Sequence, residues 1–244
     1  MAYKEDSDLE FLQDCSQEDL DILVDILTKS KEGSSRITEE LTITDEYKEH
    51  YPNHNKYWNL IAAEVQCYGA NSIATIFRAG VGVLYKEILN DVCDRMKVNY
   101  NKSSNIDIIE TNLLMKVLVD SLENMDPEQL KELVRTLDLK TTNLTKQGVT
   151  AALQATIKFS GFAVYKTAAI IANAVAKAIL GRGLTFAANA SLMKGISFFA
   201  GPVGWVITGL WTILDIAGPA YRITIPSVVQ IAYMRAKLKY GDRT

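Results

Sequence analysis

The chain has 244 residues, of which 48% are hydrophobic and 23% charged, and its net charge at neutral pH is −3. A chain of this length can bury a sizeable core as one large domain or two small ones, and this composition argues against an intrinsically disordered protein. Apolar residues recur at helical spacing from end to end, while alternating β-branched runs are scarce, so we expect an all-α, multi-helix bundle.

The first predicted helix begins after Ser16 and ends near Lys29. Ser16 suits the N-cap position, and Asp19 stands three residues further on, in an approximate capping box. The preceding residues 8–12 have the apolar spacing of a short helical turn. We interpret residues 1–45 as a small N-terminal capped-helix motif.

Three further helices are predicted between residues 53 and 122. The first covers residues 53–79, and its apolar stripe is interrupted by Gly69. The third runs from about Ile106 to Leu122. Short loops between helices are typical of a compact bundle, and we assign residues 46–145 to an acidic helical domain. In the second helix, apolar side chains stack at four-residue spacing as a core-facing row, at Leu84, Ile88, Val92 and Met96.

Residues 125–137 repeat the pattern of residues 15–27, with a capping residue, a glutamate and the spacing Leu-x-x-Leu-Val-x-x-Leu. Asp126 is expected to cap this helix, and Pro127 takes the first helical position, which proline favours. Two interpretations are open: a duplicated adaptor-type helix pair, or two capped amphipathic helices that look alike.

A long helix is predicted over residues 147–178. At 100° per residue its polar side chains fall within an arc of about 140°, and most of the remaining surface is apolar. Such a helix, about 48 Å long if unbroken, is typical of a membrane interface or of packing on an acidic protein surface. Gly181-Arg182-Gly183 is expected to end it. The polar arc consists of Gln147, Gln154, Lys158, Lys166, Asn173 and Lys177.

Residues 195–214 are twenty residues without a charge. Twenty apolar residues are enough to span a hydrocarbon core. However, Gly201-Pro202 lies in the middle of the run, so we predict a hairpin of two short apolar helices. Asp215 follows directly, and an aspartate costs about 3 kcal/mol at a bilayer centre but less near its edge.

The C-terminal end is predicted to be a connector followed by a helix. Residues 218–225 are expected to be extended, because a residue before proline disfavours the helical conformation. Pro226 then begins a last helix, which ends in basic residues that suit the helix dipole. We assign residues 146–244 to a basic, hydrophobic helical region with the hairpin and this C-terminal helix.

Charge divides the chain into two unlike halves. Residues 1–140 contain 15 lysines and arginines against 27 acids, whereas residues 141–244 contain 11 against two, Asp215 and Asp242. No glutamate follows Glu132. An asymmetry of this size suggests that the acidic and basic halves meet different partners or meet each other.

The cysteines and the N-terminus favour an intracellular location. Cys15, Cys67 and Cys93 are odd in number and far apart, which suits a reducing compartment better than a disulfide framework. The acidic start, residues 1–6, has no apolar run, so we expect no cleaved signal peptide. Ala2 stands where N-myristoylation requires glycine.

Candidate catalytic and metal-binding groups are few. The only histidines, His50 and His54, could pair as zinc ligands, but no cysteine pair lies nearby, and a polar loop or helix start is the better interpretation. Residues 80–82 and 181–183 lack the third glycine of a nucleotide-binding loop. No Gly-x-Ser-x-Gly marks a nucleophile, and the C-terminal cations are too sparse for a phosphate-binding face. We expect no catalytic residues, no cofactor, no metal ion and no nucleic acid partner.

Several pieces together resemble the YaaW family of uncharacterised bacterial proteins, over most of the chain. They are residues 8–16, the stretch 58–92 with Glu64, Gln66 and Gly69, and Gly201-Pro202-Val203-Gly204 followed by residues 220–232. The tail is the most specific part. The resemblance implies a bacterial, cytoplasmic protein and provides no catalytic residues, because the family has no assigned activity. The middle region is also distantly similar to a respiratory-complex assembly chaperone.

Our main functional hypothesis from the sequence is a non-enzymatic helical protein that interacts with membranes, by perturbing them or forming pores. The acidic half would hold the basic, hydrophobic half until release. The expected partner is an anionic lipid membrane or a helical protein, with homo-oligomers as a further option. The expected location is the cytoplasm, with attachment to or insertion in the inner membrane as a further option. The expected contact residues are Lys158, Lys166, Lys177, Lys194, Gly201, Pro202, Trp205, Trp211, Arg222, Arg235, Lys237 and Lys239.

Two alternatives stay open at this point. One is a soluble helical interaction or chaperone-like module, in which the same apolar segments are the protein's own core. The other is an enzyme of an unrecognised type. Protection of residues 195–214 in the absence of lipid would favour the interaction module.

Overall fold

The structure is a computed structural model that describes residues 2–29, 40–73, 82–184 and 220–241. Every regular element in these ranges is an α-helix or a 3-10 helix, which confirms the predicted all-α class. The predicted hairpin at residues 195–214 lies outside the described residues. The division into three domains is not tested by this arrangement and stays a prediction.

The first helix begins directly after its predicted N-cap residue, Ser16. A 3-10 helix, η1 (Glu10–Asp14), precedes α1 (Gln17–Thr28). The Ser16 hydroxyl oxygen accepts a hydrogen bond from the Asp19 backbone N–H at 3.3 Å, and the hydroxyl donates to Asp19 Oδ2 at 2.7 Å. The side chain of Asp19 is therefore fixed at the start of α1, where the helix dipole favours a negative charge.

Within the described residues, the middle of the chain confirms the predicted helices with one change at the start. Residues 74–79 of the first of these helices lie outside the described residues. Residues 54–57 form a 3-10 helix, and the α-helix begins only at Trp58. The capping box of the later helix is complete, because Asp126 accepts from the Gln129 N–H at 3.0 Å and the Gln129 side chain accepts from the Asp126 N–H at 2.6 Å. The elements are η2 (Leu41–Ile43), α2 (Asp45–His50), η3 (His54–Tyr57), α3 (Trp58–Ile73), α4 (Tyr85–Arg95), α5 (Ile106–Leu122) and α6 (Pro127–Thr136).

The predicted long helix over residues 147–178 is broken into two. Helix α7 (Lys146–Phe159) ends at Ser160, whose backbone is extended with φ −133° and ψ 106°, and α8 (Gly161–Leu180) begins directly after it. The Ser160 hydroxyl oxygen caps α8 by accepting from the Ala163 N–H at 3.2 Å. The prediction of an unbroken helix was wrong because serine competes for backbone hydrogen bonds and favours caps. As predicted, α8 ends at Gly181, in the left-handed conformation with φ 71°.

The predicted extended connector before Pro226 is also wrong. Helix α11 (Tyr221–Tyr240) is continuous through these residues, with Pro226 inside it. Proline removes one hydrogen bond near the start of a helix. Tertiary packing outweighs this loss, because the residues on both sides of the proline are buried, among them Ile223, Ile225 and Val228.

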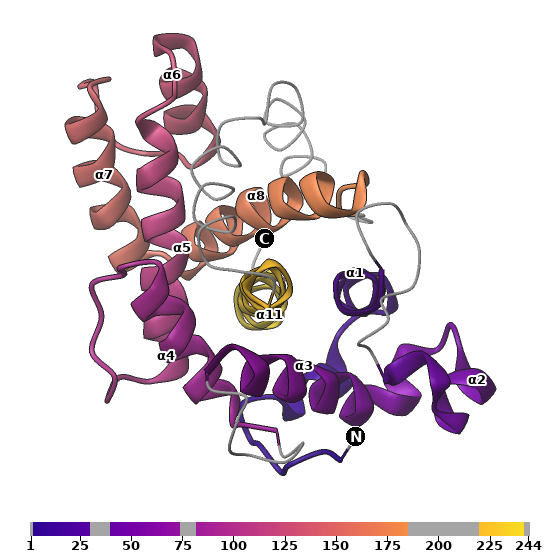
Figure 1. Cartoon of the computed structure of the whole chain (residues 1–244). Helices are drawn as coiled ribbons and strands as arrows, with labels where there is room; N and C mark the ends of the chain where they lie inside the picture. The colour runs from indigo at the N-terminus through magenta and orange to yellow at the C-terminus, as the bar shows by residue number, and fades with distance from the viewer. Residues whose placement is uncertain (1, 30–39, 74–81, 185–219, 242–244) are drawn as a thin grey trace.

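Helix α11 lies at the centre of the bundle (Figure 1). It contacts α1, α3, α4, α5 and α8, and its side chains from Ile223 to Met234 are all buried. A helix that is buried on every side shows no amphipathic stripe, and its polar side chains Thr224, Ser227 and Gln230 are buried together with the apolar ones. The C-terminal helix is therefore the core of the fold, and elements of both halves pack around it.

The acidic and basic halves meet at the end of this central helix. Lys237 Nζ donates to Asp19 Oδ2 at 2.6 Å, and Lys239 forms an ion pair with Asp107. Asp19 belongs to α1 and Asp107 to α5, so acids of the first half neutralise cations of the second. Of the two arrangements that the charge asymmetry allows, the structure contains the one in which the halves meet each other.

Candidate functional site

One predicted contact residue, Arg235, lies in a buried polar cluster. Its Nε donates to both carboxylate oxygens of Glu110, at 3.1 and 3.0 Å, and its Nη2 donates to the Asp8 carbonyl at 2.6 Å. The Tyr85 hydroxyl also donates to Glu110, at 2.7 Å. Burial raises the pKa of Glu110, and the nearby Arg235 lowers it in part. This cluster holds α11 to α4, α5 and the N-terminal segment.

The predicted arc of polar residues does not form one stripe facing solvent. Lys158 of α7 is exposed, whereas Lys166 and Lys177 of α8 are half-buried. Lys166 Nζ donates to the Thr136 carbonyl at 3.2 Å. Asn173 is buried, and its Oδ1 accepts from the Leu184 N–H at 3.0 Å. The arc is split because the break at Ser160 turns α8 into the bundle.

The remaining predicted contact residues fall in two places. Arg222 is exposed in the first turn of α11, at the end opposite to Arg235. Lys194, Gly201, Pro202, Trp205 and Trp211 lie outside the described residues. Contact between any of the predicted residues and a partner stays a prediction.

A groove of about 1000 Å³ lies between α5, the α7–α8 junction and the end of α11. Tyr240 packs on Gly161 beside it, where a Cβ on the glycine would overlap with the tyrosine ring. The groove is partly apolar, and neutral side chains such as Asn112 and Gln154 also line it. Its apolar side chains are Ile108, Met115, Val119, Ile157, Phe159 and Val164.

Two large apolar side chains of the groove are exposed to solvent. Phe159, the last residue of α7, is 84% exposed, and Ile108 of α5 is 52% exposed. Single exposed apolar residues are normal on a protein surface, but two beside one concave surface are typical of a binding site. The break at Ser160 exposes Phe159, because the chain leaves the axis of α7 directly after it.

The charged side chains of the groove are mainly cationic. Lys116 pairs with Asp120 and Lys239 with Asp107. Lys158 lies 5.8 Å from the centroid of the adjacent Phe159 ring and has no carboxylate partner among the described residues. The α7 and α8 sequences contain no carboxylate at all. One wall of the groove therefore presents an unneutralised positive charge next to its most exposed aromatic ring.

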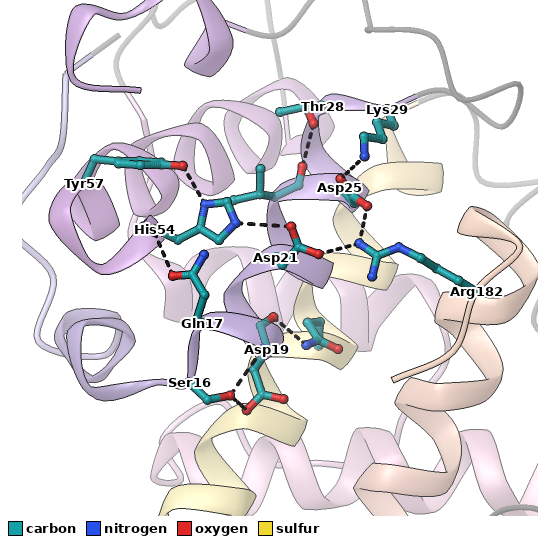
Figure 2. A network of polar contacts seen from close by, with 12 residues as sticks. Ser16, Gln17, Asp19, Asp21, Asp25, Thr28, Lys29, His54, Tyr57 and Arg182 are labelled. Atoms are coloured by element: carbon teal, nitrogen blue, oxygen red, sulfur yellow. Dashed lines mark hydrogen bonds and ion pairs between the residues drawn. The ribbon is translucent and has the colours of Figure 1, made fainter. Parts of the chain in front are cut away.

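A second polar cluster, shown in Figure 2, joins α1 to the chain after α8. Arg182 Nη2 donates to Asp21 at 2.7 Å and also pairs with Asp25. The buried His54 places Nε2 3.3 Å from Asp21 Oδ1 and Nδ1 2.5 Å from the Tyr57 hydroxyl. Because a carboxylate only accepts, Nε2–H donates to Asp21, and the other ring nitrogen, Nδ1, forms its hydrogen bond with the Tyr57 hydroxyl.

This cluster serves to join distant segments. Both ring nitrogens of His54 have partners and its side chain is fully buried, so neither nitrogen is available to a substrate. His54 begins η3, whereas His50 is the last residue of α2, so the interpretation as a helix start holds for His54 alone. Among the described residues no three histidine, cysteine, aspartate or glutamate side chains are placed to hold a metal ion.

The cluster predicts a dependence of stability on acid pH. The hydrogen bond from His54 lowers the pKa of Asp21 to about 2, with a further contribution from Arg182. A carboxyl group whose pKa is lower in the folded state stabilises the fold above its unfolded pKa, near 4, and this stabilisation is lost as the pH falls through about 2. When the pH falls from 4.5 to 2.5, we expect the free energy of unfolding to decrease less in Asp21→Asn than in the wild type.

Urea unfolding of both proteins at the two pH values measures this difference. Asp14→Asn is the matched control, because Asp14 is an exposed aspartate with no ion pair among the described residues. An Asp21→Asn variant whose urea midpoint falls as much as that of the wild type would show that Asp21 makes no stabilising contact in the folded protein.

Sequence reasoning missed the residues that form the groove and the second cluster. No sequence pattern singled out Ile108, Phe159 or Asp21. Arg182 was assigned only to the end of a helix. The one local indication was Ser160-Gly161 inside the predicted long helix, a pair that favours a break.

Comparison with known proteins identifies relatives along the whole chain. Residues 3–37 match a domain of unknown function, DUF3944, and residues 53–229 match the family described as Ubiquinol-cytochrome C chaperone. A UPF0174 protein of Helicobacter pylori strain J99 is 52% identical over 99% of this chain and 96% of its own length. The UPF0174 protein YaaW of Escherichia coli K12 is 33% identical over 96% of this chain and 95% of its own length. No solved structure matches this chain.

The match with a chaperone family contradicts our main hypothesis of a membrane-perturbing or pore-forming protein, and it favours the alternative of an interaction module. Within the described ranges, Gly161–Leu180 is the one helix long and apolar enough to cross a membrane, with a mean hydropathy of 1.4. The bundle buries 72% of that stretch. The apolar composition of this helix is therefore explained by its burial in the core.

Proposed function

We propose that this chain, which belongs to the UPF0174 family that includes YaaW of Escherichia coli, is a non-enzymatic helical module that binds a protein partner as a chaperone does. The observation that supports the proposal most strongly is the match of residues 53–229 with a chaperone family. That region includes α3 to α8 and the first half of α11. We carry over to this chain only the chaperone-like binding of a protein partner. The partner that the family description names is a property of that family and is not proposed for this chain.

The groove supports binding of a protein partner. Aromatic side chains that are exposed in the free protein and rimmed by polar groups are frequent anchors of protein interfaces. Phe159 has this environment, with Ile108 in the same groove and Lys158 beside it. Helix α5 and the α7–α8 junction, which form two sides of the groove, both lie within the region that matches the chaperone family.

The cysteines support a non-enzymatic function in a reducing compartment such as the cytoplasm. All three cysteines are free thiols. Burial raises the pKa of Cys15 and of Cys93 to about 12, and it also raises the pKa of Cys67. A thiol reacts as its thiolate, so these groups are poor nucleophiles at neutral pH.

Photo-cross-linking in cells tests the proposal. We expect p-benzoylphenylalanine at position 159 of the full chain to give one or a few protein adducts of defined mass in bacteria that naturally make this protein. Position 43 is the control, because Ile43 is 66% exposed and precedes α2, on the other side of the bundle from α7 (Figure 1).

Chaperone action has a second expected result. Deleting the gene should lower the abundance or solubility of the cross-linked partner, and the wild-type gene should restore it. If position 159 gives no adduct beyond those of position 43, and deletion leaves the abundance and solubility of other proteins unchanged, the proposal is wrong.

A further inference from the structure

We propose that the groove binds an amphipathic helix of the partner protein that carries carboxylates along the edge next to Lys158. This inference rests on the proposed function and adds the chemistry of the bound segment. The groove contacts the apolar face of such a helix. Lys158 favours a helix that carries negative charges along the adjacent edge. Three observations support it: the shape of the groove, its apolar anchors and its charge.

The shape of the groove suits a helix better than a small ligand. Its sides are α5 and the α7–α8 junction, the end of α11 lies beside them, and the groove is open to solvent rather than enclosed. Its volume of about 1000 Å³ is at the upper limit of ordinary small-molecule sites. An amphipathic helix that lays apolar residues at positions i, i+3 or i+4, and i+7 into a groove is a common mode of peptide recognition.

The apolar anchors are placed on two sides of the groove. Phe159 lies at the end of α7 and Ile108 in the first turn of α5. An apolar face inserted between them would remove from water two side chains that are 84% and 52% exposed in the free chain. Burial of apolar surface is the main source of affinity in such complexes.

The charge of the groove determines which amphipathic helix fits. Lys116 and Lys239 already have carboxylate partners, and Lys158 has none among the described residues. The nearest wall, formed by α7 and α8, contains no carboxylate that could pair with a cationic partner. A glutamate or aspartate on the bound helix would pair with Lys158, whereas a lysine there would be repelled. A single unneutralised cation is too little for a nucleic acid backbone, which needs a cluster of them.

Binding of synthetic helical peptides to the full chain tests the inference. The probes are two fluorescein-labelled 16-residue peptides with the same leucine face, one with glutamates and the other with lysines along the edges, and a scrambled glutamate peptide. Fluorescence anisotropy measures each Kd. We expect the wild type to bind the glutamate peptide about ten-fold more tightly than the lysine peptide and to bind the scrambled peptide least.

Two substitutions in the groove separate charge from apolar contact. Lys158→Glu should weaken binding of the glutamate peptide and strengthen binding of the lysine peptide, reversing the preference, while Lys158→Gln should only reduce it. Phe159→Ala should weaken binding of both peptides about 30-fold, as loss of an aromatic anchor does. The controls are Lys131→Glu and Ile43→Ala, exposed residues that do not line the groove, which should change neither Kd.

The possible results separate this inference from the proposed function. Equal binding of both peptides, or a preference that Lys158→Glu does not reverse, would overturn the charge selection. Binding that Phe159→Ala leaves unchanged would overturn the site. In either case a cross-linked partner at position 159 in cells would leave the proposed function standing. If neither peptide binds while that partner is found, the bound segment is not an amphipathic helix, and the inference is wrong.

Discussion

Replacing Arg235 with methionine is expected to lower the free energy of unfolding by about 3–5 kcal/mol, because it leaves a carboxylate buried without its counter-charge. The Glu110 side chain is only 4% exposed, and Arg235 donates to both of its oxygens. Arg235 also lies over the Phe11 ring, at 4.1 Å from its centroid, and donates to the Asp8 carbonyl. Methionine fills much of the same space but replaces none of these polar contacts.

A double-mutant cycle identifies the buried charge as the cause. Glu110→Gln removes the charge and keeps an oxygen that accepts from the Tyr85 hydroxyl. The double variant Arg235→Met/Glu110→Gln should therefore be more stable than Arg235→Met alone, although one more residue has been changed. Urea unfolding at neutral pH measures all four proteins. If the double variant is the less stable of the two, an uncompensated charge is not the reason for the loss.

The stability that Arg235→Met loses relative to the wild type should also depend on pH. Burial raises the pKa of Glu110, and without Arg235 that pKa rises further. A carboxyl group whose pKa is raised in the folded state contributes stability below its unfolded pKa, and this contribution is lost as the pH rises through the folded pKa. The deficit of Arg235→Met relative to the wild type should be largest at pH 7 and shrink toward pH 5. Arg235→Met/Glu110→Gln should show no such trend.

Replacing Gly69 with leucine is expected to cost about 2–3 kcal/mol, the range for forcing extra carbon atoms into a packed core. Gly69 lies in α3, and a Cβ added there would overlap with Cγ1 and Cδ1 of Ile88 in α4. Ile88 is fully buried, so it has little room to move. Leucine has a better helix propensity than glycine, but this difference stabilises the helix by only about 0.8 kcal/mol. The steric overlap with Ile88 therefore outweighs it.

Exchanging the sizes of the two side chains tests this contact. Ile88→Ala alone should cost about 2–5 kcal/mol, because it leaves a cavity. Gly69→Leu/Ile88→Ala should cost less than the sum of the two single variants by about 1 kcal/mol or more, since the leucine fills space that the isoleucine left. Thermal and urea unfolding measure the cycle. Strictly additive losses would show that Gly69 and Ile88 are not in contact.

Much of the secondary structure follows from local rules that the sequence displays. Ser16 and Asp126 were recognisable as N-caps, and the row of apolar residues in α4 and the bounds of α5 followed from helical spacing. The relation to the YaaW family was also visible in residue patterns, above all in the C-terminal tail. Each of these features depends on residues within one or two helical turns of each other.

Other features could not be predicted because they depend on residues far apart in the chain. Local rules made residues 218–225 an extended connector, yet residues 221–225 are helical, with Ile223 and Ile225 buried, and α11 lies at the centre of the bundle. The apolar C-terminal half suggested a membrane, because a sequence does not distinguish a helix buried in lipid from one buried in protein. The groove appears only when α5, α7 and α11 are brought together.

The sequence by itself determined that this protein is all-α, where most of its helices begin and end, and that its halves carry opposite charge. Only the tertiary structure decided that those charges neutralise each other: Arg182 meets Asp21 across 161 positions of the chain, and Arg235 meets Glu110 across 125. The physical reason is one of range. Helix spacing and capping act between neighbours in the chain, whereas burial and ion pairing act between any residues that the folded chain brings together.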